Sequence, residues 1–159
     1  MDDRFYTSTE TAQITGCTRR QLQYWREKGV LVPTVNTSGK GRNVYYSETD
    51  LLALTVMEYL LSIGLSFELC REALETLKAK ESWLFDDSVP LHKMKRLMFL
   101  LTESQEQKFK LAEFDKKTAL EAFSQGQAVI PFWGDRVRER LSQNLKNFKR
   151  SLSIEIGSA

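Results

Sequence analysis

The chain has 159 residues, a formal net charge of +2 and 42% hydrophobic residues, which is enough for a packed core. Its length suits one folded domain with an additional arm and leaves no room for a second large domain. No apolar stretch reaches about eighteen residues and the acidic N-terminus has no signal-peptide pattern, so we expect a cytoplasmic protein with no membrane partner. Two cysteines in separate segments exclude a disulfide framework.

Two short helices joined by a tight turn are predicted at the start of the chain. Thr7 and Glu10 have the spacing of a capping box, in which each side chain accepts a hydrogen bond from the other residue's backbone N–H. Thr18 and Gln21 repeat that spacing, and Gly29 is suited to end the helix that they begin. Two short helices joined by a turn that contains glycine form a helix-turn-helix unit.

The second helix has the composition of a DNA-reading helix. Leu22 and Trp25 are three residues apart and therefore share the inward face. The opposite face carries polar side chains, namely Arg20, Gln23, Tyr24 and Glu27, with Arg19 on its flank. Arginine and glutamine can bind guanine and adenine edges through paired hydrogen bonds, and tyrosine can donate to a phosphate oxygen. An ordinary solvated helix is the alternative interpretation.

A hairpin with a basic tip is predicted next. β-branched and aromatic residues within residues 35–46 flank the turn-forming segment SGKG at 38–41. Residues 17–46 carry six Lys or Arg residues and one acidic residue, a surplus of five positive charges in a chain with a net charge of +2. Such segregation of charge is typical of a phosphate-binding surface.

Two further helices are predicted to support the first two. Ser47 and Asp50 start another helix, which Gly64 ends, and Ser66 begins the next helix. The order of helix, turn, helix, hairpin wing and two supporting helices is that of a winged helix-turn-helix DNA-binding domain.

This order and spacing resemble the MerR family of bacterial transcription regulators over about residues 5–77. The matching segments are Tyr6 and Thr7 with Glu10, RQLQYW at 20–25, GVL at 29–31 with Pro33, YSETDL at 46–51, and the helix end at 60–65 followed by Ser66. The resemblance implies a homodimer that binds a pseudo-palindromic promoter element and distorts the DNA to switch transcription. RNA polymerase is a further candidate partner, and the protein is expected to associate with the nucleoid.

The resemblance also implies which residues contact DNA. Carried over by position and extended to neighbouring residues, the candidate set is Thr18, Arg19, Arg20, Gln23, Tyr24, Lys40, Arg42 and Tyr45. Val44 stands where the family often has an arginine, so Arg42 or Lys40 could supply that phosphate contact instead. Arg26 stands where the family often has an acidic residue, and its position near the Leu22 side of the helix favours pairing with an acidic residue of the scaffold.

A long helix is predicted over residues 91–125, which are 35 residues without Pro or Gly and would span about 50 Å. Its first half carries an apolar stripe, made of Leu91, Met94, Leu97, Met98 and Leu101. The resemblance implies that this helix pairs antiparallel with its mate in a dimer; a helix folded back on its own domain is the alternative. The predicted division is a DNA-binding domain at 1–78, a connector and long dimerisation helix at 79–125, and a C-terminal part at 126–159.

The C-terminal part is predicted to contain an apolar turn at 126–134, a helix opened by Asp135, and a frayed tail. An apolar stripe runs along the helix, made of Val137, Leu141, Leu145 and Phe148. The other side of the helix is basic, with Arg136, Arg138, Arg140, Lys146, Lys149 and Arg150. We interpret this side as solvated, with auxiliary DNA contact, docking on a partner subunit or binding to an anionic membrane as alternatives.

Catalytic, metal and cofactor sites find little support in the sequence. The single histidine, His92, lies among basic residues, and neither Cys17 nor Cys70 has a second soft ligand nearby in sequence. A buried thiol is favoured for Cys17 over a redox switch. Aromatic and methionine residues beyond residue 80 could wall a hydrophobic effector pocket or form ordinary core.

The predicted fold is therefore mainly α, with an N-terminal winged helix-turn-helix, a two-stranded wing, a long dimerisation helix and a C-terminal amphipathic helix. The predicted function is sequence-specific transcription regulation by a DNA-bound homodimer, without enzyme activity or a cofactor. An architectural DNA-binding protein without effector control, such as an excision or chromosome-organising factor, is the alternative.

Overall fold

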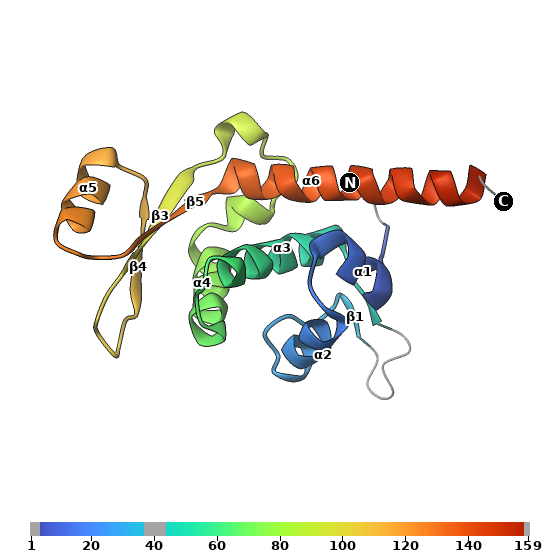
Figure 1. The fold of residues 1–159 in the computed structure, drawn as a ribbon, viewed down its shortest axis with the longest axis horizontal. Coiled ribbons are helices and arrows are strands. Elements are labelled where there is room, and N and C mark those ends of the chain that lie inside the picture. The colour runs from blue at the N-terminus through green and yellow to red at the C-terminus, as the bar shows by residue number, and fades with distance from the viewer. Residues whose placement is uncertain (1–3, 37–43, 158–159) are drawn as a thin grey trace.

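The structure is a computed structural model that describes residues 4–36 and 44–157. In the described residues it is mainly helical, with two small antiparallel sheets. The N-terminal helices and the first sheet lie on one side of the molecule, the second sheet lies at one end, and a long C-terminal helix connects the two parts (Figure 1).

The first two helices begin at the residues that the sequence predicted. α1 spans Ser8–Thr15 and α2 spans Arg19–Glu27. Both predicted capping boxes are present: the Thr7 hydroxyl accepts from the Glu10 N–H at 3.2 Å and the Thr18 hydroxyl accepts from the Gln21 N–H at 3.0 Å. The caps satisfy N–H groups that the first helical turn leaves without a partner, so they fix where each helix begins.

The hairpin wing is described only at its base. β1 (Val35–Asn36) and β2 (Val44–Tyr45) pair antiparallel, with Val35 opposite Tyr45. Tyr46 continues this edge by exchanging two backbone hydrogen bonds with Tyr6, of 2.8 and 2.9 Å. The predicted basic tip, which includes Lys40 and Arg42, lies outside the described residues.

Two longer helices follow the wing. α3 spans Glu48–Ser62 and α4 spans Phe67–Lys80. The Asp50 carboxylate completes the capping box with Ser47 and also accepts from the Thr34 N–H at 2.8 Å. This contact ties the segment before β1 to the start of α3, so the wing base and the helix that supports it are held together.

The predicted long helix over residues 91–125 is wrong. After two single-turn 3-10 helices, η1 (Ser82–Phe85) and η2 (Leu91–Lys93), the chain forms a three-stranded sheet and a short helix. The elements are β3 (Arg96–Leu101), β4 (Phe109–Glu113), α5 (Lys116–Ser124) and β5 (Val129–Trp133). Both β4 and β5 pair antiparallel with β3, which is the central strand.

The prediction failed because both faces of β3 are covered. Leu97 and Phe99 point into the main core, whereas Met98 and Leu100 point into a smaller cluster with Ala122 of α5. Burial on both faces makes the strand a continuous apolar run, and such a run also contains the three- and four-residue spacings of a helix. Leucine and methionine are strong helix formers as well, so tertiary packing overrides the local preference.

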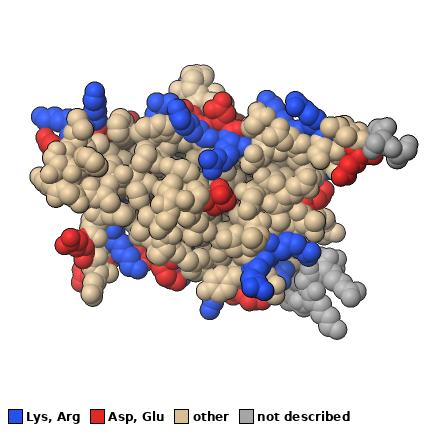
Figure 2. All heavy atoms as spheres, in the orientation of Figure 1, with Lys and Arg blue, Asp and Glu red and all other residues tan. Residues whose placement is uncertain are grey.

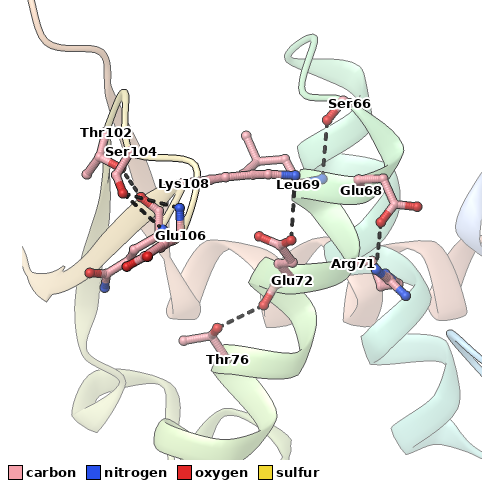
Figure 3. Close-up of polar contacts among 11 residues, drawn as sticks. Ser66, Glu68, Leu69, Arg71, Glu72, Thr76, Thr102, Ser104, Glu106 and Lys108 are labelled. Atoms are coloured by element: carbon pink, nitrogen blue, oxygen red, sulfur yellow. Dashed lines mark hydrogen bonds and ion pairs between the residues drawn. The ribbon is translucent and has the colours of Figure 1, made fainter.

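The β3–β4 turn also lacks the glycine or proline that would reveal it in the sequence. The Ser104 hydroxyl accepts from the Glu106 and Gln107 N–H groups at 3.2 and 3.4 Å, and Thr102 hydrogen-bonds across the turn (Figure 3). Serine and threonine side chains can thus build a turn without glycine. Beyond the turn, Lys108 reaches the Glu72 carboxylate of α4 at 3.6 Å, which connects the sheet to the N-terminal helices (Figure 3).

The predicted C-terminal helix is present as α6 (Gly134–Gly157) and begins one residue before Asp135. The predicted apolar turn at 126–134 instead contains the strand β5, and the predicted frayed tail is helical as far as Gly157. Figure 1 shows it as a single orange-to-red helix that runs along α3 and past α1. Val137, Leu141 and Phe148 are buried, and Leu145 is half-buried, as the predicted apolar stripe requires. One continuous core therefore joins α1, α3 and α4 to the sheet and to α6.

Candidate nucleic-acid interface

The inner face of α2 holds the helix firmly against the core. Leu22 and Trp25 are each 2% exposed, as their spacing predicted. The Trp25 carbonyl also accepts hydrogen bonds from the Val30 and Leu31 N–H groups, at 2.9 and 3.3 Å. The orientation of α2 is therefore fixed at its inner face and at its C-terminal end, which determines the direction in which its outer face points.

The outer face presents two arginines to solvent. Arg19 and Arg20 are exposed in the first turn of α2, beside the Thr18 cap. Within residues 4–36 and 44–157 neither arginine forms an ion pair. The helix N-terminus adds a partial positive charge, so this end of α2 can attract a phosphate group.

Gln23 is held in place by Glu27. Both side chains are exposed, and the Gln23 amide nitrogen donates to a Glu27 carboxylate oxygen at 3.0 Å. A glutamine amide has two N–H groups and one carbonyl oxygen. One N–H and the oxygen therefore remain available, which is the pair that binds an adenine edge.

Tyr24 is supported from two sides. Its ring is 5.2 Å from the Phe67 ring of α4, and the Lys28 ammonium lies 5.6 Å from the centre of the Tyr24 ring. The side chain still remains 43% exposed. The contacts restrict where the ring can lie, and a phenol hydroxyl in such a position can donate to a phosphate oxygen.

Another of the predicted residues lies at the base of the wing. Tyr45 of β2 is 37% exposed, whereas its neighbour Val44 is buried. Thr18 is exposed, with its hydroxyl occupied as an acceptor by the helix cap. The structure thus brings Arg19, Arg20, Gln23 and Tyr24 together on α2, with Thr18 at the N-cap of this helix. Lys40 and Arg42 lie outside the described residues.

Arg26 points away from the outer face. It is half-buried, and its charge counteracts the rise that burial causes in the pKa of the Tyr46 hydroxyl, so the two side chains lie close together. No acidic residue in the described part of the chain forms an ion pair with Arg26, so the predicted pairing is not found there.

The surface over α2 is basic. Figure 2 shows a group of Lys and Arg side chains there. On α6, by contrast, two of the basic side chains that were predicted to be solvated, Arg138 and Arg140, contact other parts of the protein. Arg138 donates to the Val89 carbonyl at 2.8 Å and pairs with Asp87 at 3.2 Å, and Arg140 pairs with Glu58 at 3.3 Å.

Sequence reasoning gave no role to three residues that shape this surface. Glu27 orients Gln23, and Lys28 and Phe67 support Tyr24. The four-residue spacing of Gln23 with Glu27, and of Tyr24 with Lys28, places each pair on one side of the helix and could have revealed them. Phe67 gave no such signal because it comes from another helix.

The first two helices, the wing base and the basic outer face of α2 define a helix-turn-helix fold, and comparison with known proteins agrees. Residues 6–77 match the family described as MerR HTH family regulatory protein. The match covers nearly half of the chain, and it is the same part that the sequence analysis found to resemble this family.

Comparison with curated proteins gives relatives that are named as regulators. The chain is 34% identical over 76 residues to proteins of Mycobacterium bovis and Mycobacterium tuberculosis that are named uncharacterized HTH-type transcriptional regulators. The aligned residues are 47% of this chain and 34% of each relative, so the match spans about a third of the relatives' length. Separately, no helix in the described ranges is both long and apolar enough to cross a membrane.

Proposed function

We propose that this protein is a sequence-specific DNA-binding transcription regulator that inserts α2 into the major groove. The observation that carries the proposal is the outer face of α2, where exposed arginines lie beside a positioned glutamine on a helix anchored by Leu22 and Trp25. A helix held in this way can enter the groove without losing its own packing.

The residues divide between base edges and phosphates. Arg20 and Gln23 read bases, since both side chains can form paired hydrogen bonds to a base edge. The other residues bind the backbone and set the register on the duplex; these are Thr18, Arg19, Tyr24 and Tyr45, with Lys40 and Arg42 of the wing. All of them lie within residues 1–78, which we propose as the DNA-binding unit.

The protein acts as a homodimer on a pseudo-palindromic promoter element and distorts the DNA between the half-sites. The short α2 supports this proposal, because nine residues expose only a few side chains to base edges, and a second copy doubles the sequence that is read. The contact between the copies is not the helix first expected at residues 91–125, since that segment forms the sheet and α5. The regulator would act in the cytoplasm, at the nucleoid, in contact with RNA polymerase.

The test is selection of bound fragments from genomic DNA with the full chain, followed by footprinting of the best fragment and sedimentation of the complex. Two half-sites related by two-fold symmetry, bound by two copies across a promoter, are the expected result. Salt-sensitive binding without a shared sequence would overturn the proposal and would favour an architectural DNA-binding protein.

A further inference from the structure

A small pocket lies where α3, β5 and α6 meet. Its volume is about 280 Å³, and its walls include Tyr59 of α3 and Trp133 at the end of β5. Pockets that bind small molecules have volumes of about 300 Å³ or more. This pocket is at the lower end of that range, so it suits a small ligand of one or two fused rings. It is separate from the outer face of α2.

The aromatic walls are fixed in place without a ligand. The Tyr59 hydroxyl donates to the Pro131 carbonyl at 2.7 Å. The Trp133 ring lies 4.9 Å from the Phe114 ring, and the Arg96 guanidinium lies 5.3 Å from the centre of the Trp133 ring. Rings that are already held lose little conformational entropy when a flat ligand packs against them.

The charge in this pocket has one sign. Arg136, Val137 and Arg140 line it. Arg140 is four residues from Arg136 and three from Val137, and these spacings put the three side chains on one side of α6. The lining residues include no Asp or Glu. Arg140 contacts the Glu58 carboxylate through one guanidinium nitrogen, at 3.3 Å, which leaves its other donors for a second acceptor. Arg136 is exposed and forms no ion pair with any described residue.

A neighbouring pocket shows how specific this combination is. It has a volume of about 330 Å³ and lies beside the start of α3, η1 and α6. Its lining mixes both signs, with Glu48 and Asp87 as well as Lys146 and Lys149. An anion there would meet carboxylates as well as cations, whereas the residues that line the pocket at Trp133 include two arginines and no carboxylate.

We propose that the pocket at Trp133 binds a small aromatic carboxylate. The ring packs between Tyr59 and Trp133, and the carboxylate accepts hydrogen bonds from Arg136 and Arg140. The planar guanidinium group matches a carboxylate through two parallel hydrogen bonds, and aromatic walls match a flat ring. The ligand would bridge α3 of the DNA-binding unit to α6, so its binding stabilises the contact between the two parts.

Calorimetric titration of the full chain with naphthalene-2-carboxylate tests this site, with naphthalene-2-carboxamide as the neutral probe of the same shape. We expect one carboxylate per chain and a dissociation constant about tenfold lower than that of the amide, because hydrogen bonds to a charged group are stronger than those to a neutral one. Arg136→Gln should weaken carboxylate binding about tenfold and leave amide binding unchanged.

Arg150→Gln is the matched control, since it removes the same charge from α6 about 21 Å further along the helix. It should leave both titrations unchanged. No saturable carboxylate binding, equal affinity for the acid and the amide, or equal effects of the two substitutions would each overturn the proposal. Circular dichroism of both variants verifies that α6 is intact, and none of these readouts involves DNA.

Discussion

Gln23 and Glu27 lie one turn apart on the outer face of α2, joined by a hydrogen bond of 3.0 Å. Glu27 has two opposite effects on DNA binding. Its negative charge repels the phosphate backbone, whereas its hydrogen bond selects the Gln23 conformation that faces a base. Affinity for DNA in general and preference for one sequence should therefore respond in opposite directions when Glu27 is removed.

We expect Glu27→Ala to raise the affinity for unrelated DNA and to reduce discrimination at the base pair read by Gln23. The loss of discrimination is limited by the value of one paired base contact, about 1–3 kcal/mol. Titrations of the selected site and of a scrambled site at the same salt concentration measure both effects. Glu139→Ala, on the exposed side of α6, is the control for the loss of a negative charge alone. If Glu27→Ala left the discrimination between the two sites unchanged, Glu27 would not position Gln23.

Cys17 lies in the turn between α1 and α2 but is not open to solvent. It is 3% exposed, and burial raises the pKa of its thiol to about 11. Burial likewise raises the pKa of the Cys70 thiol to about 11. Both thiols are therefore protonated at neutral pH, which favours the buried-thiol interpretation of Cys17 over a redox switch.

These thiols should make stability depend on alkaline pH. In the unfolded chain they ionise near pH 9.0, whereas in the folded chain they stay protonated up to about pH 11. Their contribution to the free energy of unfolding is thus complete below pH 9 and falls as the pH rises towards 11. Urea unfolding of the wild type and of the Cys17→Ala, Cys70→Ala double variant isolates this contribution. Rapid reaction of Cys17 with a thiol reagent at pH 8 would contradict it.

Among the secondary-structure elements, the junction between β5 and α6 depends on Gly134. A Cβ atom there would lie 3.0 Å from two ring carbons of Trp83 and 3.2 Å from the Lys95 carbonyl oxygen. Those distances are too short for ordinary contacts, and the backbone carbonyl is not free to move away. The junction sets how α6 leaves the sheet and where its first turns meet α3.

Gly134→Ala should therefore lower the free energy of unfolding by about 1–2 kcal/mol, since overpacking exceeds the gain in helix propensity. Chemical denaturation measures the change. Trp83→Leu removes the ring and serves as the background in which the same substitution should cost less. An equal cost in both backgrounds would show that Trp83 is not the obstacle.

The sequence predicted the elements that have local signals and missed those that depend on packing. Thr7, Thr18 and Ser47 form the helix caps that their spacing predicted. The stripe of α6 was visible for the same reason, because one face of an exposed helix is buried. β3 gave the wrong signal, since its two faces are covered by different parts of the chain and its turn is built by Ser104.

The DNA-reading face was likewise predictable as far as one helix determines it. Leu22 and Trp25 define the inner side, so the exposed positions follow from helical geometry. The support of Tyr24 by Phe67 and the position of Arg26 near Tyr46 arise between elements, and spacing along α2 contains no information about them.

The C-terminal helix α6 is part of the same hydrophobic core as the N-terminal helices. Phe148 is 4% exposed, and its ring meets the Tyr6 ring edge-on at 6.2 Å between centroids. Tyr6 in turn pairs with the wing base through Tyr46. The C-terminal helix thus supports the segment that holds the wing.

Phe148→Ala should lower the free energy of unfolding by about 3–5 kcal/mol, as expected for a large aromatic residue removed from a core. We also expect one cooperative transition, because the core is shared. Thermal unfolding followed by far-UV and near-UV circular dichroism measures both quantities. Two separate transitions would instead support independent folding of residues 1–78.

Selection of binding sites from random duplexes with the Arg20→Ala variant decides whether the outer face of α2 reads DNA. Arg150→Ala serves as the control for the loss of one positive charge. We expect Arg20→Ala to lose preference at one or two base pairs of each half-site and to weaken the best site by about 1–3 kcal/mol, whereas Arg150→Ala should keep the wild-type motif. An unchanged motif and affinity for Arg20→Ala would show that this face of α2 does not read DNA.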